Sequence, residues 1–172
     1  MVAILSFIAF YLSIYGITER ETTPKEFNMA TRSSIHSFDG TTLKSIYCHW
    51  DGYPSHHAPI LLEHINTPEK VAELLSYGNV SVLCENITTD KPHTFDNPQE
   101  DTTIFYGRDS GETDQEAKET TIVNLGNDHL PTSKSLPIAE AYQYLYDITA
   151  NKWYVMTGSK KWEELTKEHY ED

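Results

Sequence analysis

Residues 48–57, CHWDGYPSHH, bring together side chains that bind metal ions or move protons. His49 and Asp51 lie two apart at the end of an alternating run, so both side chains leave the same face of a strand. His56 and His57 follow within one turn of chain. Neutral imidazoles and a carboxylate suit zinc, manganese or non-haem iron. The candidate metal ligands are therefore His49, Asp51, His56 and His57.

A second group of polar side chains lies in residues 105–112, FYGRDSGE. Arg108 can hold a phosphate or a carboxylate through its planar fork of donors, and Asp109 or Glu112 can act as a general base or a ligand. If the two preceding strands are neighbours, these residues meet residues 49–57 at one end of the sheet. The candidate ligand-binding residues are His49, Asp51, Tyr53, Arg108, Asp109 and Glu112.

Each of these groups also has a purely structural explanation. DGYP at residues 51–54 is typical of a turn, and Trp50 and Tyr53 suit a core that needs a polar edge. Arg108 and Asp109 can form a local ion pair that contributes at most about 1 kcal/mol. The chain carries no zincin, EF-hand, P-loop or nucleophile-elbow spacing. We therefore expect no cofactor, with zinc or manganese as the alternative, and favour a non-enzymatic protein.

The elements that must position these residues begin with a hairpin. Residues 31–38 and 42–50 alternate in polarity on either side of Asp39-Gly40, which is a strong signal for a tight turn between two strands. Alternation along the second strand predicts Ile46, Cys48 and Trp50 on one face and Tyr47, His49 and Asp51 on the other.

Helices are expected to follow the hairpin. A short helix is predicted around residues 57–65. The next helix is marked by Thr67 as N-cap, Pro68 at its first position and Gly78 just beyond its end. Its buried stripe comprises Val71, Leu74 and Leu75. A short strand is predicted over residues 80–83.

The second half of the chain is predicted to be loop and sheet. Residues 85–119 are acidic and rich in Thr, Asp and Pro, which predicts a long loop interrupted by a strand at residues 103–106. A further strand is predicted at residues 120–125. A second hairpin is expected from residues 141–148 and 153–157, with Tyr142, Tyr144 and Tyr146 sharing one face.

Ser159 is expected to cap a final helix, whose Trp162 and Leu165 dock on the sheet. Together these elements predict an α+β fold. It is a mainly antiparallel sheet built from N- and C-terminal β-hairpins, with two or three helices packed on one face. The domain is expected to span residues 29–172, a length that suits one hydrophobic core.

The charge of the chain restricts its partners. It carries 26 acidic and 13 basic residues, a net charge of −13. Non-specific binding to nucleic acid requires a basic surface, so nucleic acid is an improbable partner. Cys48 and Cys84 are the two cysteines in the sequence, which is too few for a disulfide scaffold and consistent with a reducing cytosol.

Residues 2–17 form one uncharged apolar run that is slightly short for a membrane span. They are expected either to anchor the chain in a membrane or to be upstream DNA read in frame from a misplaced start. Met29 opens the sequence MATRSS, and Lys25-Glu26 can be encoded by AAGGAG, a bacterial ribosome-binding sequence. A membrane is a partner only if residues 2–17 are translated.

Three motifs suggest a family. TRSSI at residues 31–35, SIYCHWDGYP at 45–54 and YGRDSGE at 106–112 resemble a group of small, uncharacterised proteins of tailed bacteriophages. The shared patterns are TRSxI, YCHWDGYP and YGRDxGE, and the similarity runs from about Met29 to the last hairpin. The group has no assigned activity, so the resemblance implies a phage accessory protein in the bacterial cytoplasm and no catalytic role.

We therefore predict a non-enzymatic protein that binds a host factor, in host takeover or counter-defence. The alternative is a small-ligand binder for a nucleotide or phosphorylated metabolite, or a metal-dependent hydrolase. That alternative requires residues 49–57 and 105–112 to converge on one pocket.

Overall fold

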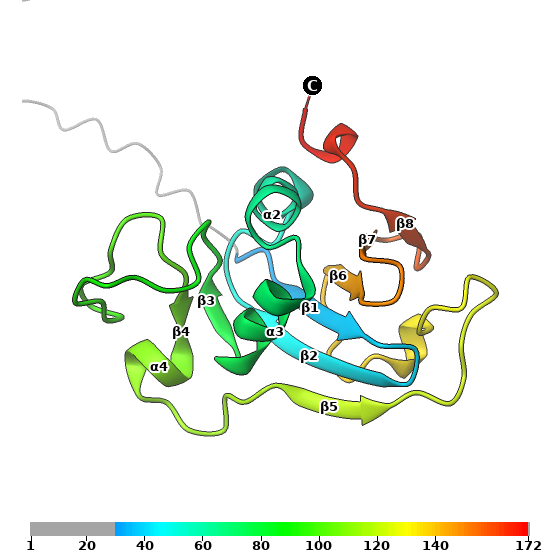
Figure 1. Cartoon of the computed structure of the whole chain (residues 1–172), viewed down its shortest axis with the longest axis horizontal. Helices are drawn as coiled ribbons and strands as arrows, with labels where there is room; N and C mark the ends of the chain where they lie inside the picture. The colour runs from blue at the N-terminus through cyan, green and yellow to red at the C-terminus, as the bar shows by residue number, and fades with distance from the viewer. Residues whose placement is uncertain (1–29, 172) are drawn as a thin grey trace, which may run out of the picture.

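Strand β1 (Ser33–Phe38) lies near the centre of one eight-stranded sheet in the computed structural model, which describes residues 30–171 (Figure 1). It pairs antiparallel with β2 (Thr42–Cys48) across the Asp39-Gly40 turn, and parallel with β6 (Tyr142–Asp147). The strand order is β4-β3-β2-β1-β6-β7-β8, and β5 pairs with the first half of β2. The other strands are β3 (Val80–Val82), β4 (Ile104–Phe105), β5 (Lys118–Thr121), β7 (Lys152–Met156) and β8 (Trp162–Glu164).

Two helical segments cover one face of this sheet (Figure 1). The first is α2 (Pro54–Pro59), which continues as a π-helical turn, Ile60–His64, and the second is α3 (Pro68–Ser76). The Thr67 hydroxyl caps α3 by accepting a hydrogen bond from the Lys70 N–H. The predicted stripe of α3 is buried, and Gly78 beyond it has a φ of 81°. The α+β, mostly antiparallel fold is confirmed.

The covered face carries the larger hydrophobic core. Ile35, Ile46 and Cys48 of the first hairpin pack there with the α3 stripe and with Tyr144, Tyr146, Trp153 and Val155 of the second. The tyrosines of β6 therefore share one face as predicted, and that face is packed. A smaller cluster occupies the opposite face, around Phe38, Leu43, Leu145, Ile122, Leu130 and Leu136. Alternation along each strand sends successive side chains to these two cores.

A polar row is buried beside the smaller cluster. The two ring nitrogens of His36 lie 2.7 Å from the Ser45 hydroxyl and 2.9 Å from the Ser34 hydroxyl, and all three residues are fully buried. Burial lowers the pKa of His36 to about 3, because the interior disfavours the charged imidazolium. His36 is therefore a neutral component of the core.

Three expected elements differ in the structure. The first helix begins at Pro54, three residues earlier than predicted, because proline suits the first helical turn. Strand β5 covers Lys118–Thr121, so it begins and ends earlier in the chain than the strand predicted at residues 120–125. The final helix was a wrong prediction: Trp162 pairs with Met156 in β8, and only a 3₁₀ turn, Lys167–His169, follows. Trp162 and Leu165 still pack against the two cores, so their alternation is that of a strand.

The possible membrane anchor, residues 2–17, and the whole segment 1–28 lie outside the described residues. Within residues 30–171, no helix combines the length and apolar character needed to cross a bilayer.

Candidate functional site

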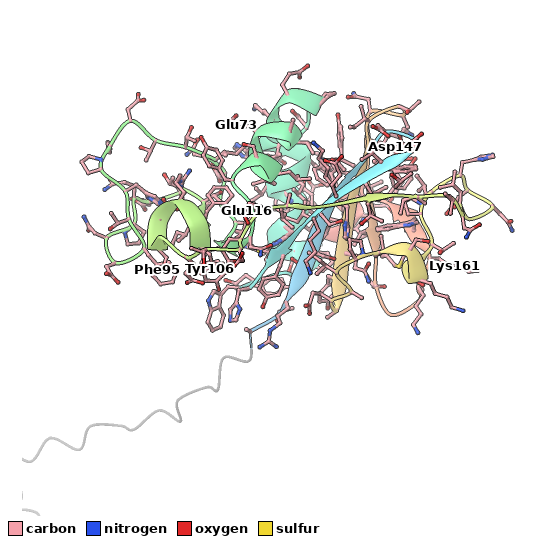
Figure 2. The ribbon with its side chains drawn as sticks, turned by 90° about the horizontal axis from the view of Figure 1, so that it is seen from below. Glu73, Phe95, Tyr106, Glu116, Asp147 and Lys161 are labelled. Carbon is pink, nitrogen blue, oxygen red and sulfur yellow. The ribbon has the colours of Figure 1, made fainter. Side chains whose placement is uncertain are left out.

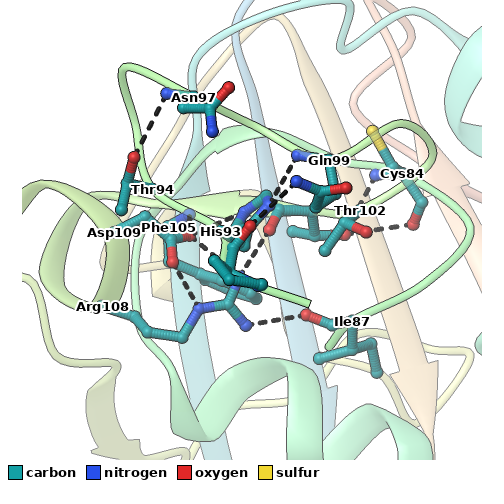
Figure 3. A network of polar contacts seen from close by, with 12 residues as sticks. Cys84, Ile87, His93, Thr94, Asn97, Gln99, Thr102, Phe105, Arg108 and Asp109 are labelled. Carbon is teal, nitrogen blue, oxygen red and sulfur yellow. Dashed lines mark hydrogen bonds and ion pairs between the residues drawn. The ribbon is translucent and has the colours of Figure 1, made fainter. Parts of the chain in front are cut away.

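Arg108 and Asp109 lie in α4 (Tyr106–Ser110), a single helical turn that the sequence did not predict. The Arg108 guanidinium donates to both Asp109 carboxylate oxygens, at 2.6 and 2.9 Å. It also donates to the backbone carbonyls of Ile87 and Thr103, at 2.8 and 2.7 Å (Figure 3). Four of the five N–H donors of the guanidinium are thus used within the molecule.

Two aromatic rings complete the surroundings of Arg108. Its guanidinium carbon lies 4.7 Å from the ring centroid of Phe105 and 5.0 Å from that of Tyr77. Both distances are within the range of a cation–π interaction. Arg108 is therefore held by ring faces and by the Asp109 carboxylate together. We define Arg108, Asp109, Tyr77, Phe105 and His93 as the arginine cluster.

The Asp109 carboxylate has little access to solvent, with 2 % of its side chain exposed. It accepts a hydrogen bond from the Phe105 N–H at 2.7 Å and lies 3.4 Å from the Nε2 atom of His93. Burial acts to raise the pKa of Asp109, but the bonds from Arg108 and Phe105 and the nearby charges outweigh it and lower the pKa. Asp109 is an ionised structural anchor.

His93 is held in one tautomer. Its Nδ1 atom accepts the Gln99 N–H at 2.9 Å, so this nitrogen carries no proton (Figure 3). The Nε2 atom lies 3.4 Å from an Asp109 carboxylate oxygen. Both nitrogens are directed into the protein, and 5 % of the His93 side chain is exposed. It attaches the acidic loop to α4.

The structure does not assemble the candidate metal ligands. His49 Nδ1 is bonded to the Tyr47 hydroxyl at 2.8 Å, and His56 Nε2 to the Leu83 carbonyl at 3.1 Å. His57 is fully buried, with Nε2 3.2 Å from the Ser33 hydroxyl. Among residues 30–171, no three His, Cys, Asp or Glu side chains are placed to hold a metal ion. The four predicted ligands therefore do not converge on one site within these residues, and metal binding stays a prediction.

Ser33 and His57 have the contact of a nucleophile and its base, but they are sealed from solvent. Both residues are fully buried. A Cβ on Gly52 would lie 2.6 Å from the Ser33 Cβ and 2.8 Å from the Thr31 carbonyl, so there is no room for a substrate. Burial lowers the pKa of His57 to about 3, which makes it a weak base. The pair is part of the packing between β1 and α2.

Neither cysteine has the environment of a nucleophile. Cys48 is fully buried, and burial raises the pKa of its thiol to about 12. Burial and the negative charges of Asp101 and Glu85 raise the pKa of Cys84 to about 11. Both are thiols at neutral pH, and thiols are poor nucleophiles.

The two predicted loops do not meet on one face. Cys48 is paired with Val80, and Val80 with Phe105, so these three side chains point into the same core. Arg108 lies over the Phe105 ring on that side. His49, next to Cys48, points to the opposite face. Strands β2, β3 and β4 are neighbours as the hypothesis required, but the sheet separates the two groups.

Asp51 and Tyr53 join neither group. Asp51 has a φ of 55°, which ends the alternation of β2 and turns the chain toward α2. Tyr53 is exposed, and its ring meets the edge of His56 at 6.0 Å between centroids. Of the six candidate ligand-binding residues, Arg108 and Asp109 bond to each other. Asp51 and Tyr53 are also neighbours, because burial and the nearby Asp51 carboxylate raise the pKa of Tyr53.

A row of aromatic side chains lies on the opposite face from Arg108. The His49 ring meets Trp50, Tyr47 and Tyr106 with centroids 4.8, 5.8 and 6.5 Å apart. Tyr106 in turn stacks on Phe95 at 6.1 Å, and Figure 2 shows these two side by side at one end of the molecule. We define Tyr47, His49, Trp50, Tyr106 and Phe95 as the aromatic strip.

The aromatic strip is accessible and has charged neighbours. Phe95 is 40 % exposed, and the other four rings are half-buried. Burial raises the pKa of Tyr106. Glu112 is linked to the same residue, because its N–H donates to the Tyr106 carbonyl at 3.1 Å. Arg32 lies at the other end, where it donates to the Tyr47 hydroxyl at 3.1 Å. Sequence reasoning missed the strip for two reasons. Alternation wrongly predicted Trp50 on the core face with Ile46 and Cys48, whereas it packs against His49. Phe95 and Tyr106 join the strip only through the fold.

Two cavities adjoin the predicted residues. One, of about 500 Å³, lies beside the arginine cluster and is also lined by Lys91 and Thr88. A second, of about 260 Å³, contains His56 and Cys84 among several carboxylates. A third, of about 400 Å³, lies between α3 and the β2–β5 pair, where Val71 and Leu75 line it. None of these three contains both His49 and Arg108.

Comparison with known proteins gives no match to this chain, whether against family models, curated proteins or solved structures.

Proposed function

We propose that this chain is a phage accessory protein that acts in the bacterial cytoplasm by binding a host protein, and not by catalysis. The observation that carries the proposal is that the polar candidate residues are bonded within the protein, whereas an aromatic surface remains accessible. Arg108, Asp109 and His57 are bonded inside the molecule, whereas Phe95 of the aromatic strip is exposed and its other four rings are half-buried. Tyrosine, tryptophan and other aromatic side chains are enriched where proteins bind one another.

The charge of the loop region supports the same function. Residues 85–119 contain ten acidic and three basic residues, so they account for −7 of the net charge of −13. Phe95 and Tyr106 of the strip belong to this region. A concentrated field of one sign speeds association with a partner of the opposite sign.

A pull-down from bacterial lysate tests the proposal. The tagged full-length chain is compared with Phe95→Ala, which trims an exposed ring of the strip, and with Leu125→Ala. Leu125 is a matched control because it is 39 % exposed, against 40 % for Phe95, and lies in a different loop. We expect a near-stoichiometric protein with the wild type and the control, and a depleted band with Phe95→Ala. Absence of such a protein, or equal recovery with all three baits, would refute the proposal.

Binding of a small phosphorylated ligand is a second candidate, favoured by the cavity of about 500 Å³ beside Arg108 and Lys91. Asp109 and Glu73 also line this cavity and oppose an anion. Calorimetric titration with inorganic phosphate and with nucleotides tests it. Heat of binding that disappears in Lys91→Ala would support this candidate over the first.

A further inference from the structure

The Phe95 end of the aromatic strip combines exposed ring faces with carboxylates. Phe95 and Tyr106 stack at 6.1 Å with an interplanar angle of 29°. The Glu112 N–H donates to the Tyr106 carbonyl at 3.1 Å. The exposed Glu112 carboxylate accepts long hydrogen bonds from Ser110 Oγ at 3.3 Å and Gln115 Nε2 at 3.5 Å. Asp96, the neighbour of Phe95 in the chain, is also exposed. Ring faces attract cations and carboxylates attract guanidinium groups, so both features favour the same kind of ligand.

In the arginine cluster, the same combination of aromatic rings and a carboxylate binds a guanidinium group of the chain itself. Two rings, Phe105 and Tyr77, and one carboxylate, Asp109, surround the Arg108 guanidinium. The Phe95 end of the strip offers two rings and exposed carboxylates on the other side of the sheet, with no guanidinium between them among the described residues. Arg32 is not in this position, because it is bonded to Tyr47 at the far end of the strip.

Building on the proposed function, we propose that the Phe95 end of the aromatic strip binds an arginine-rich basic segment of the partner protein. An arginine of this segment stacks on Phe95 or Tyr106 while its fork contacts Glu112 or Asp96. The excess of seven negative charges in residues 85–119 attracts the other basic side chains. Arg32 repels them and so confines the segment to the Phe95 end. Arginine-rich segments of proteins commonly contact nucleic-acid phosphates, so the partner class is a nucleic-acid-binding protein.

Peptide binding to the purified full-length chain tests this inference directly. Three short peptides of equal length are titrated by calorimetry: one rich in arginine, one with each arginine replaced by lysine, and one with each replaced by neutral citrulline. We expect the arginine peptide to bind best, because lysine lacks the planar fork and citrulline lacks the charge. Binding should weaken as salt is raised, because the charges are exposed.

Variants locate the binding. Phe95→Ala and Glu112→Gln should each weaken the arginine peptide, by about fivefold and about threefold. The matched controls are Leu125→Ala for the lost apolar surface and Glu163→Gln for the lost charge, the latter on β8 away from the strip, and both should bind as the wild type does. The inference fails if the arginine peptide does not bind, if lysine serves equally well, or if the controls weaken binding as much as the strip variants.

The two experiments separate the inference from the proposed function. A host protein that is lost with Phe95→Ala, combined with no binding of the arginine peptide, would leave the proposed function standing and reject the arginine-rich segment. Binding of the peptide without recovery of a host protein would support the arginine-binding site and refute the proposed function. If neither is observed, both proposals are rejected.

Discussion

The arginine cluster and the aromatic strip lie on opposite faces of the sheet around β3 and β4, and both have aromatic rings with carboxylates nearby. In the cluster the guanidinium is supplied by the chain itself, and the side chain of Asp109 is almost completely buried. In the strip the rings contact one another, and Phe95 remains 40 % exposed. Similar side-chain chemistry therefore stabilises the fold on one side and is partly exposed on the other, where we propose that it binds a partner.

This difference has an energetic basis. A buried carboxylate requires a bonded cation, so removing Arg108 or Asp109 leaves the charge of the other residue uncompensated. An exposed ring loses little when trimmed, because water already covers part of its surface. Substitutions in the cluster should therefore change stability, and substitutions in the strip should change binding.

Acid should have the largest effect, because two buried histidines have pKa values far below that of a histidine in the unfolded chain. His36 and His57 stay neutral in the folded protein down to about pH 3, whereas in the unfolded chain they take up protons near their ordinary pKa of 6.5. Stability is therefore full above that pH and falls as the pH drops from 6.5 toward 3. Each group contributes about 1.4 kcal/mol per pH unit, which gives a loss of about 5 kcal/mol near pH 4.5.

Urea unfolding at a series of pH values measures this loss, and imidazole NMR signals identify the groups. The signals of His36 and His57 should not titrate in the folded protein above about pH 4. The range above pH 7 is the internal control, because both imidazoles are neutral there in either state. The prediction would be contradicted if the His36 and His57 signals titrated near pH 6.5 and the urea midpoint did not change between pH 7 and pH 4.5. Asp109, whose folded pKa is lowered, adds a further loss at still lower pH.

Arg108→Ala should destabilise the protein by about 3 kcal/mol, because it leaves the buried Asp109 carboxylate without its cation. It also removes donors from the Ile87 and Thr103 carbonyls. The free energy of unfolding in urea measures the change. Arg32→Ala is the matched control, since Arg32 is exposed and bonded only to a tyrosine hydroxyl; it should cost less than about 1 kcal/mol. If the two substitutions lowered the free energy of unfolding equally, Arg108 would be no more important for stability than an exposed arginine, and the prediction would be wrong.

Arg108→Lys should cost about 1–2 kcal/mol, less than the alanine substitution, because the charge opposite Asp109 is kept. An ammonium group cannot bridge both Asp109 oxygens and two carbonyls at once, as the guanidinium does. Amide hydrogen exchange of residues 87–99 should also increase, because these bonds attach the loop to α4. Unchanged exchange would show that the loop is held by other contacts.

Phe95→Ala should have the smallest effect on stability, within about 0.5 kcal/mol of the wild type. Its effect should be confined to binding, in the lysate and with the arginine peptide. Urea unfolding of the same sample provides the check. A loss of stability comparable with that of Arg108→Ala would mean that the ring is part of the core, and the contrast between the two faces would be lost.

Local signals in the sequence predicted most elements correctly. Asp39-Gly40 placed the first hairpin, and Thr67, Pro68 and Gly78 placed α3, because turns and caps depend on residues close in the chain. The single turn α4 was missed because five residues give no periodicity, although Gly111 with a φ of 73° is a cap that marks its end.

The candidate sites were harder to predict because they depend on pairing between distant strands. Nothing local shows that Phe105 aligns with Cys48 through Val80, and this alignment decides that Arg108 and His49 face opposite ways. Alternation also failed at Asp51, whose left-handed backbone ends the strand pattern. The ion-pair explanation of Arg108 and Asp109 was correct in kind, but the partners that bury it, from Ile87 to Thr103, are distributed along the acidic loop.

The parallel pairing of β1 with β6 has a consequence for synthesis on the ribosome. β1 emerges early with β2, yet its other edge stays unpaired until residues 142–147 have left the exit tunnel. Through the whole interval the nascent chain presents an open strand edge beside buried-type side chains, a surface that invites pairing with other chains. Completion of the sheet is thus a late event that depends on the C-terminal hairpin. Expressing that hairpin as a separate chain offers a route to control assembly by adding the missing half.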